Sequence, residues 1–159
     1  MSARICFILL SESRCSAGAA EFSPALLDSM QHKQTYIAHG EAFAPLFALF
    51  HEGDFLKGKS VMWFIDNLGV LSCFCKGSSV VADVGCIVHA VLLHQAALKV
   101  QAWYEHVDSK ANIADGGTRF STEITDALGI SLKQLSLPPW PANTLTAPPS
   151  EWISWFQLK

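Results

Sequence analysis

The sequence contains few charged residues and no excess of positive ones. Of its 159 residues only 16% are charged, and the formal net charge is −3. A protein that binds a polyphosphate on its own usually has a basic surface, because its cations neutralise the phosphates. The charge balance therefore argues against strong autonomous binding to nucleic acid. It does not exclude a metal-dependent nuclease, whose carboxylates approach phosphate only through a cation.

A disulfide framework, a membrane span and a phosphate-binding glycine loop are also missing. The five cysteines are odd in number and irregular in spacing, and Cys73 and Cys75 have no second pair at zinc-ligand spacing. We therefore expect structural thiols. The longest apolar stretch, Val80 to Val100, is interrupted by Asp83, His89 and His94 and predicts a buried helix. We expect a soluble, intracellular protein (cytoplasm or nucleus) that does not contact a membrane. An unrelated small-molecule α/β enzyme is disfavoured, because no glycine-loop or nucleophile motif is present.

The hydrophobic pattern predicts one α/β domain in which helices cover a central mixed sheet. We expect a domain over residues 1–121, followed by a C-terminal helix and a tail rich in proline and tryptophan over 122–159. The expected strands are Ile5 to Leu10, Ser60 to Ile65 and Val100 to Val107, with a less regular extended piece near Pro24 to Met30. The expected helices are Tyr36 to Phe50, Asn67 to Cys75, a long helix capped by Ser78 or Ser79 that ends near Lys99, a turn over Asn112 to Arg119, and Thr122 to Leu135.

Two segments are harder to assign: one helix has an uncertain start, and one segment is expected to be a loop. Pro45 removes a helix hydrogen bond, so the helix expected over Tyr36 to Phe50 either begins near Ala42 or is kinked at Pro45. Cys15 to Ser23 is small and contains glycine, and we expect a loop there. In the tail, Trp140, Trp152, Trp155 and Phe156 favour docking on an apolar surface.

Three acidic residues occupy the ends of expected elements. Glu41 lies at a helix start, Asp66 ends a buried strand, and Asp115 lies in a polar turn after another strand. If these elements are neighbours, the acids meet at one edge of the sheet, where ligands of α/β proteins commonly bind. Clustered carboxylates favour Mg²⁺ or Mn²⁺, and two such ions can promote phosphodiester hydrolysis. Taken singly, each acid also fits a helix cap or a surface group.

The motifs around these acids resemble a known family. The segment Tyr36 to Ala44 looks like the glutamate helix of ribonuclease H, and Trp63 to Asn67 with Lys76 to Ser79 looks like its strand, metal-binding Asp-Asn and following helices. Glu105 to Arg119, with Asn112-Ile113-Ala114-Asp115, resembles the closing motif of ribonuclease H domains attached to retroelement reverse transcriptases. The resemblance covers about Thr35 to Arg119, more than half of the chain.

The resemblance implies a role for each matched residue. Glu41, Asp66 and Asp115 would bind metal, and Asn112 would orient the closing turn. His106 sits where cellular members carry a histidine thought to help proton transfer or product release, although a strand-end histidine bonded to backbone fits equally. Asp108 competes with Asp115 as the third acid, and the Asn-x-Ala-Asp context favours Asp115. The implied activity is hydrolysis of the RNA strand of RNA–DNA hybrids during reverse transcription, with an upstream reverse transcriptase domain as a partner.

One departure from the family concerns its first strand, whose Asp bridges the two metal ions. The Ile5 to Leu10 strand looks more like the family's second strand, and the nearby acids are Glu12, Glu21 and Asp28. We expect the first strand and its Asp to be lost or to lie upstream of Met1, which exposes a strand edge unless the tail covers it. Activity is then doubtful, and the alternative function is a non-catalytic structural or interaction remnant of a reverse transcriptase polyprotein.

Overall fold

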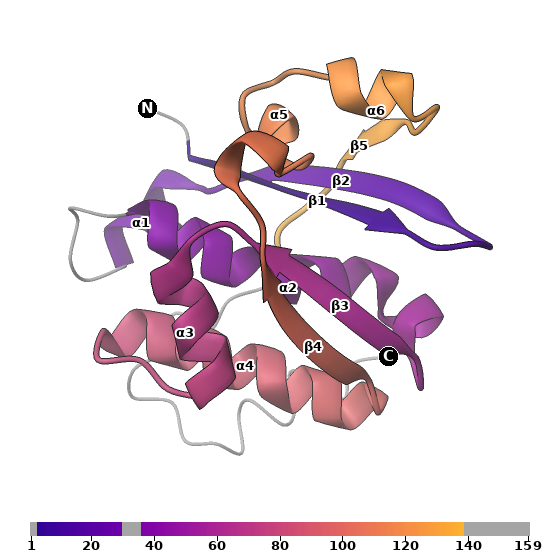
Figure 1. Cartoon of the computed structure of the whole chain (residues 1–159). Coiled ribbons are helices and arrows are strands. Elements are labelled where there is room, and N and C mark those ends of the chain that lie inside the picture. Colours follow the sequence, from indigo (N-terminus) through magenta and orange to yellow (C-terminus); the bar gives the residue numbers. More distant parts are fainter. Residues whose placement is uncertain (1–2, 30–35, 139–159) are drawn as a thin grey trace.

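The strands form two separate sheets in the computed structural model, which describes residues 3–29 and 36–138 (Figure 1). In the first sheet, β1 (Arg4–Leu10) pairs antiparallel with β2 (Cys15–Glu21), and β2 pairs parallel with β5 (Leu132–Gln134). In the second, β3 (Ser60–Ile65) pairs parallel with β4 (Gln101–His106). The predicted α/β class is confirmed, as a mixed three-stranded sheet and a two-stranded parallel sheet with helices.

The central element is the long helix α2 (Tyr36–Leu56). It packs against α4 (Ala82–Leu98) and against both β1 and β3, and Figure 1 shows it passing behind the two sheets. Its side chains Phe43, Leu46, Phe47 and Leu49 are fully buried. The remaining helical segments are short: α1 (Pro24–Ser29), α3 (Leu68–Lys76), a 3₁₀ turn (Ser109–Ala111), α5 (Asp115–Thr118) and α6 (Glu123–Ala127).

The boundaries of α3 follow from local chemistry. The Oδ1 atom of Asn67 accepts hydrogen bonds from the N–H groups of Gly69 (2.9 Å) and Val70 (3.2 Å), which caps the helix N-terminus. At the other end Gly77 adopts a left-handed conformation (φ 70°), as the Lys76-Gly77 signal predicted. The sequence expectation of a short helix after Asp66 is confirmed.

The expected loop over Cys15 to Ser23 was wrong, because most of this segment forms strand β2. Its small side chains have weak strand propensity, but they pair along the whole of β1, from Arg4 opposite Glu21 to Leu10 opposite Cys15. The segment also needs its small residues. A Cβ at Gly18 would lie 2.5 Å from Leu135 Cδ1 and 2.7 Å from Phe7 Cε1. Pairing with β1 therefore outweighs the weak strand propensity of this segment.

Three further helices can be compared with what the sequence predicted. Helix α1 replaces the extended piece expected near Pro24, because Ser23 Oγ accepts from Leu26 N (3.2 Å) and proline suits a first helical turn. Of the two alternatives for α2, a start near Ala42 is excluded, because the helix begins at Tyr36 and contains Pro45. The expected cap at Ser78 or Ser79 is not at the helix start, because helix α4 begins at Ala82. The Ser79 hydroxyl instead accepts a hydrogen bond from Val81 N (3.1 Å), just before the helix.

The single helix expected over Thr122 to Leu135 was also wrong. Helix α6 ends at Ala127, and Gly129 has a φ of 66°, which a helix does not accommodate. The chain then returns to pair β5 with β2. The tail beyond Pro138, with its prolines and tryptophans, lies outside the described residues. None of the described helices is long and apolar enough to span a membrane.

Candidate functional site

The parallel pairing of β3 and β4 brings two of the predicted residues to one edge. Ile65, the last residue of β3, lies opposite His106, the last residue of β4. Val107 N donates to Ile65 O (3.1 Å) and extends the ladder by one bond. Asp66 therefore leaves the sheet beside His106, whose side chain is exposed.

Glu41 comes to this edge from helix α2. Its Oε2 atom is buried and has no hydrogen-bond partner, whereas the side chain of Asn67 hydrogen-bonds the carboxyl group. Burial raises the pKa of Glu41 to about 7, the negative charges of Asp66 and Asp115 add to this rise, and the Asn67 bond opposes it. Asp66 and Asp115 are thus each close enough to Glu41 to disfavour its charged form.

Asp115 is held by the turn that contains Asn112. Asn112 Oδ1 accepts from Ala114 N (3.1 Å), and Asp115 then begins helix α5. Thr118 Oγ1 donates to the Asp115 carbonyl oxygen (2.7 Å), and Arg119 Nη2 lies 3.1 Å from Asp115 Oδ2. The Asp115 carboxylate is therefore oriented by its own helical turn, and the positively charged Arg119 side chain lies beside it.

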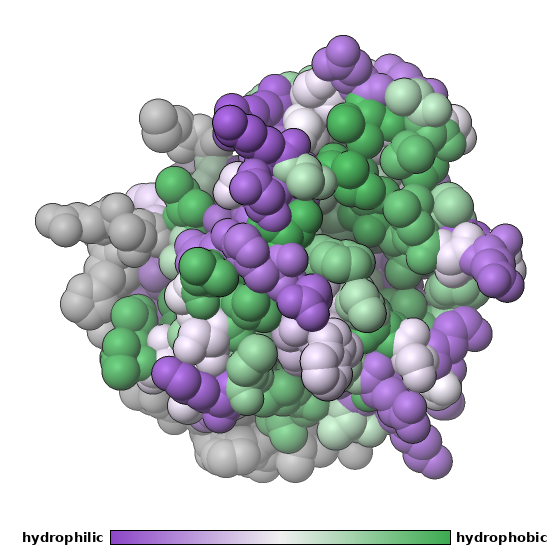
Figure 2. Space-filling view, viewed as in Figure 1, coloured by the Kyte–Doolittle hydropathy of each residue, from purple (hydrophilic) through white to green (hydrophobic). Residues whose placement is uncertain are grey.

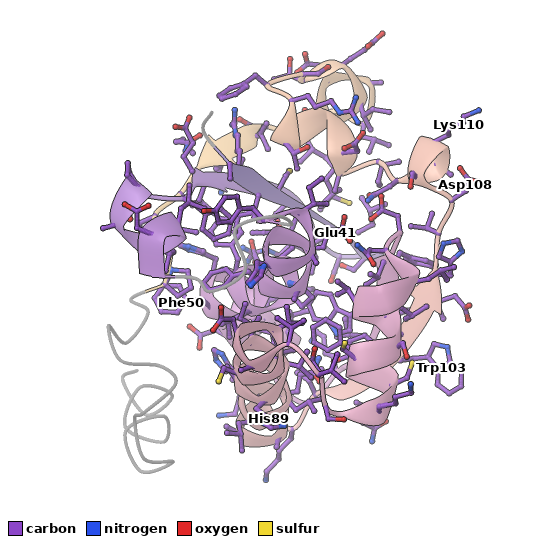
Figure 3. The ribbon with its side chains drawn as sticks, turned by 90° about the vertical axis from the view of Figure 1, so that its left-hand side faces the viewer. Glu41, Phe50, His89, Trp103, Asp108 and Lys110 are labelled. Carbon is purple, nitrogen blue, oxygen red and sulfur yellow. The ribbon has the colours of Figure 1, made fainter. Side chains whose placement is uncertain are left out.

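The competing acid Asp108 is placed differently. Its Oδ1 atom accepts from Lys110 N (2.9 Å) and caps the 3₁₀ turn. Figure 3 shows Asp108 and Lys110 at the periphery, away from Glu41. The charges that act on Glu41 are those of Asp66 and Asp115. Glu12 is also remote, because Figure 1 shows the β1–β2 turn at the opposite end of the sheets from the end of β3.

The donor chemistry of these residues fits a hard divalent cation. Three carboxylates supply only oxygen ligands, and the unpartnered, buried Oε2 of Glu41 is a costly group that a cation would stabilise. Within residues 3–29 and 36–138, however, no group of three or more His, Cys, Asp or Glu side chains forms a ready metal site. Binding would therefore require the carboxylates to close around the ion.

Asn67 is the residue whose importance the sequence reasoning missed. It was noted as part of the Asp-Asn motif, but not as the group that orients Glu41. A usable signal was present, because Asn directly before an apolar helical run is a strong N-cap. Arg119 and Thr118, which position Asp115, were likewise not assigned a role.

Comparison with protein-family models, curated proteins and solved structures gave no significant match in any of the three. The functional interpretation therefore depends on the motifs and on the geometry described above.

Proposed function

We propose that this chain is a ribonuclease H-like domain that hydrolyses the RNA strand of RNA–DNA hybrids with divalent metal ions. The observation that carries the proposal is the buried, unpartnered Oε2 of Glu41, placed in the field of Asp66 and Asp115. The element order supports it as well: a hairpin, a long acid-bearing helix, a strand ending in Asp-Asn, two helices, a parallel strand and a closing Asn-x-Ala-Asp turn.

In this proposal Mg²⁺ or Mn²⁺ ions, when bound, supply an activated water and stabilise the leaving oxygen of the phosphodiester. Glu41, Asp66 and Asp115 would hold the ions, and Asn67 would orient the Glu41 carboxyl group through its amide. His106, exposed at the end of β4, would assist proton transfer or product release, as the resemblance implies. Hybrids would be recognised by shape and 2′-hydroxyl groups rather than by base sequence.

The net charge of −3 shapes the expected binding. Without a basic surface, affinity for a hybrid has to come from the metal-loaded site or from an adjoining domain. A reverse transcriptase domain upstream is the partner that the resemblance implies, and the proposal includes it.

The test is hydrolysis of a labelled RNA–DNA hybrid by the full chain in Mg²⁺ or Mn²⁺. Changes in the outer shell of a metal site commonly cost about 10–100-fold in activity, so loss of a ligand in Glu41→Gln or Asp66→Asn should cost at least about 100-fold. Asp108→Asn is the matched control, since Asp108 points away from Glu41. Equal turnover in all three variants would contradict the assignment.

A second function, a non-catalytic structural or interaction module, is favoured by one specific observation. The described residues bring three acids together rather than the four of the family, and they form no ready metal site. The two functions differ in metal binding, which stabilises a folded protein by mass action. A rise of several degrees in Tm with millimolar Mn²⁺, absent in Glu41→Gln, supports the nuclease; no rise supports the structural module.

A further inference from the structure

Phe120 has a backbone conformation that large side chains rarely adopt. Its φ is 62°, in the left-handed region, at the position that follows helix α5 and its C-cap. Glycine normally takes this position at the end of a helix, because a Cβ is strained there. Gly58, Gly77 and Gly129 do so after α2, α3 and α6, and among the described residues only Lys99 is a second exception. A phenylalanine here carries a cost in strain, and strained residues gather at functional sites.

The turn and a neighbouring cation hold the Phe120 ring in place. Ser121 N donates to Gly116 O (2.9 Å) and closes the chain around Phe120. The Arg4 guanidinium lies over the ring, with Cζ 4.2 Å from the ring centroid. Arg4 is itself fixed by Gln134, whose Oε1 accepts a hydrogen bond from Nη2 (3.1 Å). The ring is therefore supported on a fixed cation.

The fold buries little of this ring. Phe120 is 60% exposed even with Arg4 stacked on it. A cation over an exposed ring contributes a modest stabilisation, no larger than the usual cost of a left-handed residue that has a Cβ. A supported, exposed aromatic ring is suited to ligand contact, because it offers a large apolar area and loses little side-chain entropy on binding.

The ring follows directly on the turn that holds Asp115. Arg119 precedes Phe120, and its Nη2 atom lies 3.1 Å from Asp115 Oδ2. Figure 2 shows hydrophilic side chains over α5 and over the chain that leads into it from β4. Phe120 therefore places an exposed aromatic side chain beside a polar surface, at the end of the short helix that Asp115 begins.

The cation that supports the ring is close to the helix that carries Glu41. Arg4 is followed by Ile5, and a Cβ at Gly40 would lie 3.6 Å from Ile5 Cγ2. Gly40 directly precedes Glu41 in α2. Both α2 and α5 pack against β1, so the stack of Arg4 and Phe120 lies near two of the three predicted acids.

We propose that Phe120 is a substrate-binding residue whose ring contacts a ribose of the RNA strand in the minor groove of an RNA–DNA hybrid. This inference rests on the proposed nuclease function and extends it. In a duplex the bases stack on one another, whereas the wide, shallow minor groove of an A-form helix presents riboses and 2′-hydroxyl groups. An exposed ring beside the acids can meet these sugars when a phosphodiester lies at the acids. The contact needs no positive charge, which suits a chain with a net charge of −3.

The test is binding of a fluorescein-labelled RNA–DNA hybrid to the full chain, measured by fluorescence anisotropy with Ca²⁺ in place of Mg²⁺. Ca²⁺ also takes oxygen ligands, and its use separates binding from turnover. Phe120→Leu keeps the strain and an apolar side chain but removes the ring, and should raise Kd about 10-fold. Phe120→Trp keeps a ring and should bind within about 2-fold of the unmodified chain. Trp103→Leu is the matched control, because Trp103 is an aromatic residue of similar exposure (64%) that lies away from Glu41 (Figure 3), and its Kd should not change.

A further variant, Phe120→Gly, separates binding from folding. Glycine relieves the backbone strain, so Tm should stay the same or rise by about 2–4 °C. Hybrid binding should nevertheless weaken about 10-fold, as in Phe120→Leu. A ring that only stabilised the fold would give the opposite result, a lower Tm with unchanged binding.

Several results would overturn the proposal. These are unchanged binding by Phe120→Leu, a fall of several degrees in the Tm of Phe120→Gly, an equal loss of binding in Trp103→Leu, or no hybrid binding by the unmodified chain. A larger loss with single-stranded RNA than with hybrid in Phe120→Leu would assign the ring to unpaired bases and overturn the ribose contact. The proposed nuclease function fails separately: a chain that binds hybrid through Phe120 but hydrolyses none in Mg²⁺ or Mn²⁺ would leave the ring contact intact.

Discussion

The side chain of Asn67 hydrogen-bonds the carboxyl group of Glu41, and this bond joins the loop after β3 to helix α2. The amide can act in this way because its other end is fixed. Asn67 Oδ1 accepts from Gly69 N and Val70 N at the start of α3, so the NH₂ group is turned toward Glu41. One side chain therefore both starts a helix and orients an acid of the candidate site.

Substitutions at Asn67 should separate these two roles. Asn67→Ala loses the cap and the bond to Glu41, and we expect a loss of about 1 kcal/mol in the free energy of unfolding from the cap alone. Asn67→Asp keeps the capping oxygen but replaces the donor with a negative charge beside Glu41, so its stability should fall more steeply as the pH rises through 7. Urea unfolding at pH 5 and pH 8 measures both effects. If Asn67→Ala had the same pH dependence of stability as the unmodified chain, the bond to Glu41 would contribute nothing.

The elements that the sequence predicted well are those with strong local signals. Strands β1 and β3 were predicted from short apolar runs and β4 from alternation, and Asn67 and Gly77 mark the two ends of α3. Strand β2 carries no such signal. Its alanines, serine and glycine become a strand only because β1 is beside them, and the three residues of β5 depend in turn on β2.

The candidate site divides in the same way. The positions of Glu41, Asp66 and Asp115 near the ends of helices and strands could be predicted from the order of these elements. The effect of Asp66 and Asp115 on Glu41 could not be predicted, because it depends on how α2 packs against β3 and how α5 packs against β1.

A close approach between α5 and β1 should make Gly117 intolerant of a side chain. A Cβ at Gly117 would overlap Cys6 Sγ and lie 3.0 Å from Cys6 Cβ, whereas a Cβ at Gly116 would come no closer than 3.7 Å to Ser121 O. We expect Gly117→Ala to cost about 1–3 kcal/mol by overpacking and to displace Asp115. Gly116→Ala is the matched control and should be neutral or slightly stabilising. Chemical denaturation of both variants checks this, and equal stabilities would contradict the tight contact.

A partly buried ion pair outside the site provides a stability prediction. Glu52 of α2 is 7% exposed, accepts from Ser16 Oγ (2.8 Å) and lies 2.7 Å from Arg14 Nη2. Removing the guanidinium leaves a buried carboxylate with one partner, and because Arg14 is itself half-exposed we expect Arg14→Met to cost about 1–3 kcal/mol. Methionine retains the apolar stem beside Phe55.

The measurement for this pair is a double-mutant cycle by urea denaturation. Glu52→Gln in the Arg14→Met background should cost less than in the unmodified chain, because the charge that lost its partner is then gone. Lys57→Met, at an exposed position near the end of α2, is the control for loss of a positive charge. Additive costs in the cycle would mean that Arg14 and Glu52 are not coupled.

The raised pKa of Glu41 should make the protein less stable as the pH rises through neutrality. The ordinary pKa of a glutamate is 4.5, and in the folded chain that of Glu41 is about 7. Between these values the folded state binds more protons than the unfolded state, so the free energy of unfolding decreases as the pH rises from about 4.5 to about 7 and then levels off.

Glu41→Gln removes this dependence and should raise Tm at pH 8 by about 2–4 °C, which corresponds to roughly 1 kcal/mol in a domain of this size. Glu12→Gln, at an exposed position in the β1–β2 turn, should leave the pH profile unchanged. Thermal unfolding of the three proteins between pH 4 and pH 8 measures the effect, and parallel profiles would show that Glu41 ionises in the folded chain as it does in the unfolded one.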